Sequence, residues 1–296
     1  MPEEQRPDPT PGGGEPKEHP LPGVKHIIAV SSGKGGVGKS TVTVNLAVAL
    51  QREGYTVGLM DADIYGPNIP MMIGVTKEPV KEEEKIHPGE GQGVKVISMG
   101  FFVPEDTPVV WRGPMIHSAI QQFFRDVLWG ELDFLLIDLP PGTGDVPLTL
   151  SQLVPLTGAI TVTTPQEVAL HDVRKGMTMF KKVNVPLLGV VENMSFFVCG
   201  HCGERSEIFS FGGGERAAQK FEIPFLGRIP IDPSIREAGD TGKPIVVENP
   251  TSPQSEAFVG IARTLVGNIE QAEKGDGKPT LSSLLKKIKE PLQGSS

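Results

Sequence analysis

The sequence predicts a doubly wound α/β fold, with a mostly parallel sheet flanked by helices. Short apolar runs recur along the chain, helical patterns lie between most of them, and a glycine-rich turn joins the first run to the first helix. Continuous apolar strands that alternate with helices are typical of a parallel sheet covered on both faces. The expected strands are residues 26–32, 56–63, 94–100, 134–140, 158–165, 186–194 and 224–230.

The chain divides into one domain and two tails. Residues 1–23 are rich in Pro, Gly and Glu and bury too little apolar surface to offset the entropy of ordering, so we expect a disordered leader. A domain over 24–272 follows, and residues 273–296 should form a linker and a short amphipathic tail. Within the domain we expect a helix over 41–54, a charged exposed loop over 76–93, a cysteine-containing insertion over about 195–215 and a last helix over 252–272.

Composition and charge exclude several function classes. The formal net charge is −8, whereas nucleic-acid binding draws its affinity from concentrated Lys and Arg. No run approaches the ~18 apolar residues of a membrane-spanning helix. The amino terminus also lacks the basic-then-apolar order of a secretory signal. We therefore expect no nucleic-acid partner, no spanning segment and a cytoplasmic location.

A phosphate-binding loop follows the first strand. The segment GKGGVGKS matches the pattern G-x-x-x-x-G-K-S after a strand and at the start of a helix, where backbone N–H groups and the helix N-terminus bind phosphate. Lys39 is expected to reach the β- and γ-phosphates of ATP, and the Ser40 hydroxyl to bind Mg²⁺. The predicted nucleotide-binding residues of this loop are Gly33, Lys34, Gly35, Gly36, Val37, Gly38, Lys39, Ser40 and Thr41.

Carboxylates follow two of the predicted strands. Asp138 ends the run FLLID, which is the Walker B arrangement of a strand-end carboxylate directed at Mg²⁺ and its waters. Asp61 and Asp63 lie one residue apart and project to the same side of an extended segment. Ligands of open parallel sheets bind beyond the carboxyl ends of the strands, so these side chains should line one crevice. Hydrolysis needs a carboxylate to orient or deprotonate water, although each of the pair could instead be only a turn or cap residue.

A second lysine near the start of the loop resembles the deviant Walker A loop, KGGVGKS, of the ATPase family that includes ParA, MinD and the nitrogenase iron protein. The resemblance implies that Lys34 reaches across a dimer interface to the partner's nucleotide, so a homodimer is expected. It also implies that Asp63 positions water and that Asp61 lies near Mg²⁺, and these two roles are interchangeable on sequence alone. The predicted catalytic residues are Lys34, Lys39 and Asp63.

The same resemblance identifies a base-binding region. Asn193, at the end of VVEN, is similar to the family asparagine that hydrogen-bonds the adenine edge, and Pro230 and Asp232 fall where the family lines the base. Asn also favours strand-ending turns for purely local reasons.

The only cysteines, Cys199 and Cys202, form a C-x-x-C sequence in the insertion. They are too close to staple the fold, and their late position disfavours a thioredoxin-like redox pair. Iron-sulfur clusters and structural zinc usually take four ligands, and His201 is not expected to join the thiolates. If the ATPase dimerises, two thiolate pairs can meet across the two-fold axis and hold one bridging, transferable 4Fe-4S cluster.

Longer segments resemble the Mrp/ApbC family of iron-sulfur cluster carriers, also called the Mrp/NBP class. They cover roughly residues 24–270 and include GKGGVGKST, MDADIYGPNIP, IDLPPGTGD, VENMSFFVCGHCGERSEIF and GRIPIDPSIREAGDTGKPIV. The resemblance implies an ATPase that receives a 4Fe-4S cluster from an assembly scaffold and delivers it to apo-proteins. The additional amino-terminal cysteines of the family's eukaryotic scaffold members are absent, so no second, permanent cluster is expected.

Two alternatives stay open. The tail places Leu281, Leu284, Leu285 and Ile288 on one helical face, with lysines elsewhere, as in a MinD-like positioning ATPase recruited to a membrane. A loosely docked terminal helix explains the same pattern, and membrane recruitment does not explain C-x-x-C. The other alternative is a zinc-clasped dimeric ATPase of unrelated purpose.

Overall fold

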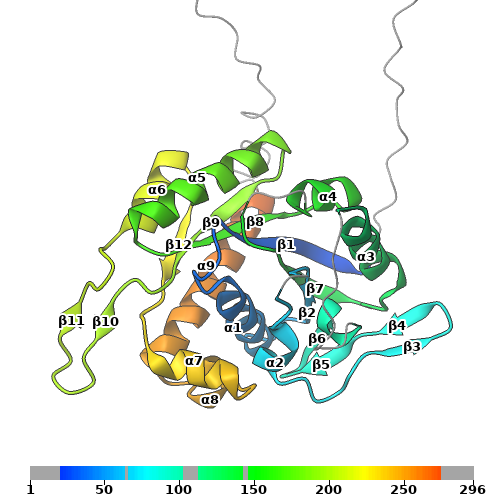
Figure 1. Cartoon of the computed structure of the whole chain (residues 1–296), viewed down its shortest axis with the longest axis horizontal. Helices are drawn as coiled ribbons and strands as arrows, with labels where there is room; N and C mark the ends of the chain where they lie inside the picture. Colours follow the sequence, from blue (N-terminus) through cyan, green and yellow to red (C-terminus); the bar gives the residue numbers. More distant parts are fainter. Residues whose placement is uncertain (1–20, 64–65, 103–112, 143–145, 275–296) are drawn as a thin grey trace, which may run out of the picture.

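An eight-stranded sheet forms the centre of the computed structural model, which describes residues 21–63, 66–102, 113–142 and 146–274 (Figure 1). Its strands are β1 (Val24–Ser32), β2 (Val57–Asp61), β5 (Gly89–Gly91), β6 (Val94–Ser98), β7 (Leu132–Asp138), β8 (Gly158–Thr163), β9 (Leu187–Glu192) and β12 (Phe225–Arg228). Their order is β12-β9-β8-β1-β7-β2-β6-β5, and all neighbours are parallel except β5 and β6. The predicted doubly wound, mostly parallel α/β fold is confirmed.

Helices cover both faces of the sheet because alternate side chains of its strands enter two separate cores (Figure 1). On β1, Ile27 and Ala29 belong to the first core, while Ile28 and Val30 belong to the second. The first core includes side chains of α3 (Gly113–Asp126), α4 (Val146–Leu153), α5 (Glu167–Lys182) and α6 (Gly213–Phe221). The second includes side chains of α1 (Lys39–Arg52), α2 (Ile69–Ile73), α7 (Pro233–Asp240), α8 (Ile245–Glu248) and α9 (Pro253–Lys274).

The predicted strands and both predicted helices are present. The helix expected over 41–54 is α1, and the one expected over 252–272 is α9. A short 3-10 helix, η1 (Met99–Phe101), follows β6. Residues 1–20 of the predicted leader and residues 275–296 of the predicted tail lie outside the described residues. Within the described ranges, no helix combines the length and the apolar character needed to cross a bilayer.

The segment 76–93 is mostly exposed, as predicted, but the prediction that it forms a loop is wrong. This segment forms the hairpin of β3 (Val80–Glu82) and β4 (Lys85–His87), followed by β5, which pairs antiparallel with β6. Each of the three strands has only three residues, which is too short for a pattern of apolar and polar residues to identify it. Pairing with β6, rather than local pattern, makes β5 a strand.

The register of the sheet brings the predicted site residues to one edge. Asp61 at the end of β2 is directly opposite Asp138 at the end of β7, and Val30 of β1 pairs with Asp138 on its other side. The loop that leaves β1 therefore begins beside Asp138, with Asp61 one strand further along the sheet. On the same edge, β9 ends at Glu192 opposite Thr163 of β8.

A contact between two glycines fixes α2 against the turn that follows α7. Gly74 and Gly242 have left-handed backbones, with φ of 67° and 69°, and a Cβ added to Gly74 would lie 2.1 Å from the Gly242 carbonyl oxygen. We predict that Gly74→Ala lowers the free energy of unfolding by about 3 kcal/mol or more, because backbone strain adds to a backbone clash. Urea denaturation measures the change.

The matched control is Gly54→Ala. Gly54 also has positive φ, 97°, but a Cβ there would meet no atom within 4 Å. Strain alone should cost about 1–2 kcal/mol. Equal losses in the two variants would mean that the contact between the glycines has no energetic role.

Candidate functional site

The phosphate loop lies between β1 and α1, with its first residues packed on α5 and its last on the end of β9. Gly38 has φ of 79°, and a Cβ there would lie 2.2 Å from the Asn193 side-chain nitrogen. Only glycine therefore allows the loop to close on β9. Val37 is buried, and its carbonyl oxygen accepts a hydrogen bond of 2.9 Å from Asn193 Nδ2. The backbone of the loop is thus held by contacts from outside it.

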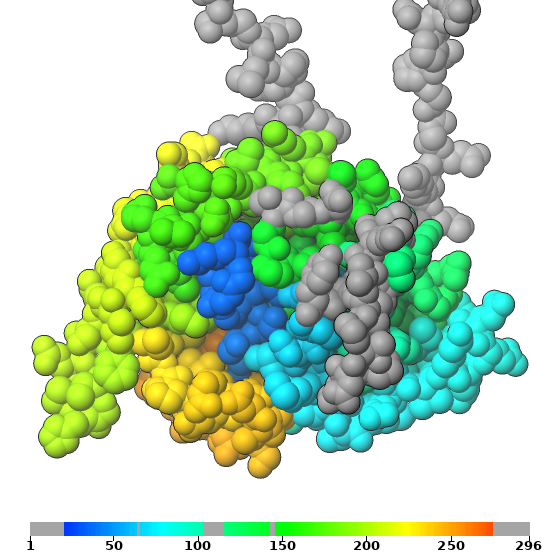
Figure 2. All heavy atoms as spheres, in the orientation of Figure 1, coloured from blue at the N-terminus to red at the C-terminus, as the bar shows by residue number. Residues whose placement is uncertain are grey.

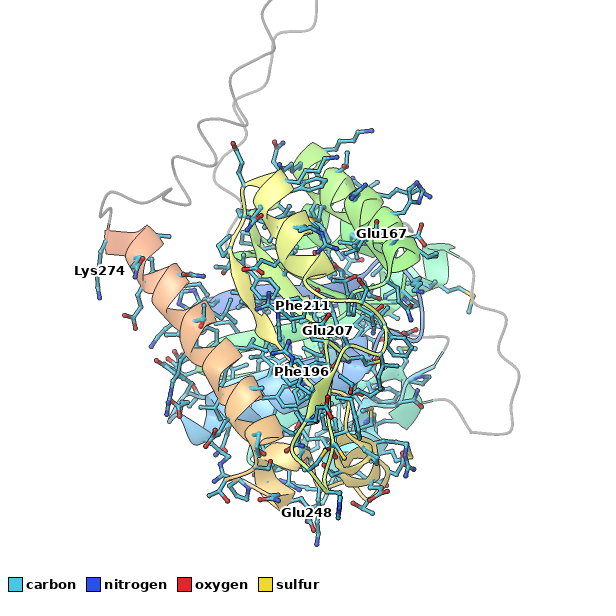
Figure 3. All side chains as sticks on the ribbon, turned by 90° about the vertical axis from the view of Figure 1, so that its left-hand side faces the viewer. Glu167, Phe196, Glu207, Phe211, Glu248 and Lys274 are labelled. Carbon is cyan, nitrogen blue, oxygen red and sulfur yellow. The ribbon has the colours of Figure 1, made fainter. Side chains whose placement is uncertain are left out.

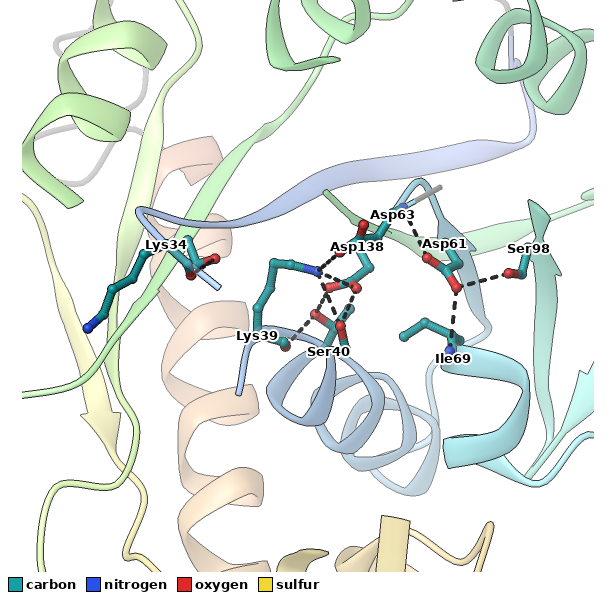
Figure 4. A network of polar contacts seen from close by, with 10 residues as sticks. Lys34, Lys39, Ser40, Asp61, Asp63, Ile69, Ser98 and Asp138 are labelled. Carbon is teal, nitrogen blue, oxygen red and sulfur yellow. Dashed lines mark hydrogen bonds and ion pairs between the residues drawn. The ribbon is translucent and has the colours of Figure 1, made fainter. Parts of the chain in front are cut away.

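Lys39 lies between the carboxylates of Asp138 and Asp63 (Figure 4). Its Nζ is 2.6 Å from Asp138 Oδ2, 3.5 Å from Asp63 Oδ2 and 3.2 Å from Ser40 Oγ. Lys39 is buried, so the pairing with carboxylates compensates its desolvation. The lysine that is expected to bind phosphate thus forms ion pairs with two carboxylates of its own chain.

Asp138 is fully buried, and each of its oxygens accepts hydrogen bonds. Ser40 Oγ donates to Oδ2 at 2.7 Å, and Thr43 Oγ1 donates to Oδ1 at 2.6 Å. A hydroxyl and a carboxylate side by side are the hard oxygen donors that Mg²⁺ prefers, so Ser40 and Asp138 fit the predicted metal. Sequence reasoning missed Thr43. Its position four residues after Lys39, on the same helix face, is the signal that could have indicated it.

Asp61 is directed away from Lys39 and into the fold. It accepts hydrogen bonds from Ser98 Oγ at 2.9 Å, from the Asp63 amide at 3.0 Å and from the Ile69 amide at 3.4 Å (Figure 4). Burial, followed by the nearby charge of Asp138, raises the pKa of Asp61 to about 7. Asp61 thus organises the chain between β2 and α2, and its expected place near Mg²⁺ stays a prediction.

A cavity of about 910 Å³ opens over the loop. Its lining includes Lys34, Lys39, Ser40, Asp63 and Pro141. Asp63 is therefore at the wall of the cavity, whereas Asp61 is behind it. The Lys34 side chain extends away from the network around Lys39 (Figure 4). The predicted catalytic residues Lys39 and Asp63 come together in one chain, and Lys34 does not join them.

A second cavity of about 610 Å³ adjoins the first, and Gly38 and Thr41 line both. The predicted base-binding residues Asn193, Pro230 and Asp232 all line the second cavity. Sequence reasoning missed its methionines, Met71, Met72 and Met194, which give it an adaptable apolar wall suited to a planar ring. The carboxylate of Asp232 also caps α7, by accepting from the Ser234 amide at 2.8 Å, and binds Gln254 Nε2 at 2.7 Å.

The cysteines lie at the tip of a hairpin that projects from the body of the protein (Figures 1 and 2). The hairpin consists of β10 (Phe197–Val198) and β11 (Arg205–Ser206), and the Cys199 amide donates to the Glu204 carbonyl at 2.9 Å. Both thiols are free; Cys199 is partly exposed and Cys202 is exposed. Among the residues described by the structure, no group of three or more His, Cys, Asp or Glu side chains could hold a metal ion.

The local backbone favours the thiolate of Cys199. The N–H of Cys202, then the N–H of His201 and the Cys202 thiol, hold the pKa of the Cys199 thiol below its usual value. A thiolate is the form that binds iron or zinc. The hairpin therefore presents two free thiols, and their role as cluster ligands stays a prediction.

Comparison with known proteins assigns the chain to a family. A family profile named ParA and described as NUBPL iron-transfer P-loop NTPase matches residues 23–266, which include the phosphate loop and the cysteine hairpin. The chain belongs to this family. An iron-sulfur cluster carrier protein from Aquifex aeolicus is 53% identical over 253 residues, which are 84% of this chain and 70% of that protein. The resemblance to cluster carriers seen in the sequence is confirmed.

Solved structures support the same assignment. A nucleotide-binding protein from Archaeoglobus fulgidus in complex with ADP has a TM-score of 0.69 and 42% identity, covering 81% of this chain and 93% of that chain. The septum site-determining protein MinD from Pyrococcus horikoshii, complexed with Mg-ADP, has a TM-score of 0.60 and 27% identity, covering 80% and 94%. The family's nucleotide-hydrolase fold is thus shared with a MinD protein.

The buried Lys39–Asp138 pair yields a prediction for Lys39→Ala. We expect ADP affinity to fall by at least ~100-fold, because the charge-assisted contact to phosphate is lost. The nucleotide-free protein should also lose about 3 kcal/mol of stability, because removing one partner leaves Asp138 buried with an uncompensated charge. Isothermal calorimetry and urea denaturation measure the two effects.

Lys220→Ala is the control, since it removes an exposed lysine of α6 that lines neither cavity. It should keep both ADP affinity and stability close to those of the wild type. Unchanged ADP affinity in Lys39→Ala would refute the assignment of the loop.

The lowered pKa of Cys199 yields a prediction for thiol reactivity. Cys202→Ser and Cys199→Ser each leave one thiol, at Cys199 and at Cys202 respectively. At pH 7 the remaining Cys199 should react with iodoacetamide several-fold faster than the remaining Cys202, because a lower pKa leaves more thiolate. The pH profile of its alkylation rate should have its midpoint below the usual thiol pKa. Equal rates and equal midpoints would contradict the backbone effect.

Proposed function

We propose that this chain is an ATP-binding and ATP-hydrolysing homodimeric carrier, which binds a bridging 4Fe-4S cluster and transfers it to apo-proteins. One observation carries the proposal: a single chain combines a phosphate loop, with its lysine and carboxylates assembled, and a pair of free thiols on a projecting hairpin. The Aquifex aeolicus relative named as an iron-sulfur cluster carrier supports the cargo.

In the nucleotide step, Lys39 exchanges Asp138 for the β- and γ-phosphate oxygens of ATP. Ser40 and Asp138 would hold Mg²⁺, which supplies positive charge against the phosphates. Asp63, at the cavity wall, orients the water that attacks the γ-phosphorus, and cleavage of the bond between the γ-phosphorus and the β–γ bridging oxygen releases ADP and phosphate. The second cavity receives the base, with Asn193 at its edge and the methionines against its ring.

The cluster is the cargo of the reaction, and each chain offers two thiolates to it. Four ligands are the common requirement, so a second copy of the chain must supply Cys199 and Cys202 again. The Lys34 side chain extends away from the network around Lys39 of its own chain (Figure 4), and this supports a contact with the partner's nucleotide. A cluster held between two projecting hairpins is accessible to other proteins and can leave.

We further propose that an assembly scaffold donates the cluster, that apo iron-sulfur proteins accept it and that exchange occurs in the cytoplasm, where thiols remain reduced. ATP and ADP states of the dimer differ in affinity for the cluster, since a nucleotide can change cluster release only through such a difference.

Anaerobic reconstitution with ferrous iron and sulfide tests the proposal. The wild type should acquire about 2 iron and 2 sulfide per subunit, which corresponds to one 4Fe-4S cluster per dimer. Cys199→Ser and Cys202→Ser should each lose most of this cluster, because a bridging site then lacks two of its four thiolates. Absorbance, iron and sulfide content, and light scattering provide the measurements.

His201→Ala is the matched control, because it changes the residue between the cysteines and should reconstitute normally. Zinc analysis of the purified protein separates a zinc-clasped ATPase from a carrier. The proposal is abandoned if the serine variants still take up and transfer the cluster, or if the reconstituted wild type is a monomer.

A further inference from the structure

Two consecutive residues at the end of β9 contact different parts of the proposed machinery. Asn193 donates a hydrogen bond to the Val37 carbonyl of the phosphate loop at 2.9 Å. Glu192, which is fully buried, accepts from Ser195 Oγ at 2.6 Å and from the Gly214 amide at 2.5 Å. Ser195 begins the cysteine insertion and Gly214 ends it, so one carboxylate binds both ends of the segment that carries the cysteines.

Two arginines and three aromatic rings form the base of the insertion. The Arg205 guanidinium carbon is 3.8 Å from the Phe196 ring centre and 4.7 Å from the Phe211 ring centre. Arg228 is 4.7 Å from the centres of Phe211 and Phe225. Figure 3 shows Phe196 and Phe211 close together where the insertion leaves the body. Alternating cations and rings connect the hairpin to β12.

Glu192 joins this base to the sheet. Arg228 Nε lies 3.7 Å from Glu192 Oε1, and the Arg228 guanidinium also pairs with Glu215. The hairpin itself contains two strands of two residues each, which are too short to hold an orientation by their own hydrogen bonds. The orientation of the cysteines therefore depends on the contacts at the base.

The start of the insertion is also fixed to the wall of the second cavity. The Ser195 amide donates to the Ile229 carbonyl at 2.9 Å, and the Ile231 amide donates to the Phe196 carbonyl at 2.7 Å. Ile231 lines the same cavity as Asn193. A ligand in this cavity would therefore contact Asn193 and Ile231, and both residues are connected to the first residues of the insertion.

We propose that Glu192 is a positioning residue that transmits occupancy of the nucleotide cavities to the cysteine pair. Asn193 has alternative partners, the Val37 carbonyl or a bound base, and any shift at Asn193 moves its neighbour Glu192. Because Glu192 binds both ends of the insertion, that shift moves the hairpin as a unit. The inference rests on the proposed function, since it specifies how the nucleotide site of the carrier changes the presentation of the thiols.

The test measures thiol reactivity of the full chain without cluster, using monobromobimane in the presence and absence of Mg-ADP or a non-hydrolysable ATP analogue. In the wild type, nucleotide should change the labelling rate by roughly five-fold or more, the lower range of coupling between two sites. Glu192→Gln should reduce this dependence, because only the amide oxygen can still accept one of the two hydrogen bonds that the carboxylate accepts. Calorimetry should show that Glu192→Gln still binds ADP, since Glu192 does not line either cavity.

Two further variants make the result specific. Glu207→Gln removes an exposed carboxylate from the same insertion and should respond to nucleotide like the wild type. Ser195→Ala keeps the Glu192 charge and removes one of its two hydrogen bonds, so it should retain part of the response. Ser195→Ala also provides the test if Glu192→Gln fails to fold.

The inference is overturned if nucleotide leaves the wild-type labelling rate unchanged, or if Glu192→Gln and Ser195→Ala respond as fully as the wild type. Because the assay contains no cluster, this outcome is independent of reconstitution. Failure of the carrier proposal would instead appear as normal cluster binding by the serine variants of Cys199 and Cys202.

Discussion

The Asp138 carboxylate has no exposure to solvent, so groups inside the protein must compensate it, and the centre of the fold depends on this requirement. Lys39, Ser40 and Thr43 satisfy it, and all three come from the first two turns of α1. The end of β7 therefore fixes the helix and the loop before it. Under the proposed function, Lys39 exchanges the Asp138 carboxylate for the phosphates of ATP.

The second carboxylate at this edge of the sheet, Asp61, is stabilised differently. Asp61 faces Asp138 across two paired strands, and the structure gives it hydrogen bonds instead of a cation. Its pKa near 7 means that the site does not have to hold two full negative charges close together at neutral pH. Asp63, two residues later, is left at the cavity wall. The pair therefore divides into one side chain that supports the backbone and one that faces the nucleotide cavity.

The cysteine hairpin has no core of its own, and its place is set by the end of β9 and by the arginine and phenylalanine side chains beneath it. This separation suits the proposed carrier, because Cys199 and Cys202 stand away from the phosphate loop and remain accessible. Few residues connect the phosphate loop to the hairpin. Among them, Asn193 contacts the phosphate loop, and its neighbour Glu192 contacts the two ends of the insertion.

Sequence alone determined the sheet, the phosphate loop, the strand-end position of Asp138 and the pairing of the two cysteines in one turn. Each of these depends on periodicity or on spacing within a few residues, which a linear sequence displays directly. Tertiary structure alone decided that Asp61 turns toward Ser98, that Thr43 completes the Asp138 network, that residues 89–91 join the sheet and that Glu192 binds both ends of the insertion. Those outcomes depend on the register of strands and on side chains that meet from distant segments, such as Val37 and Asn193, and no local pattern records which of them will be neighbours.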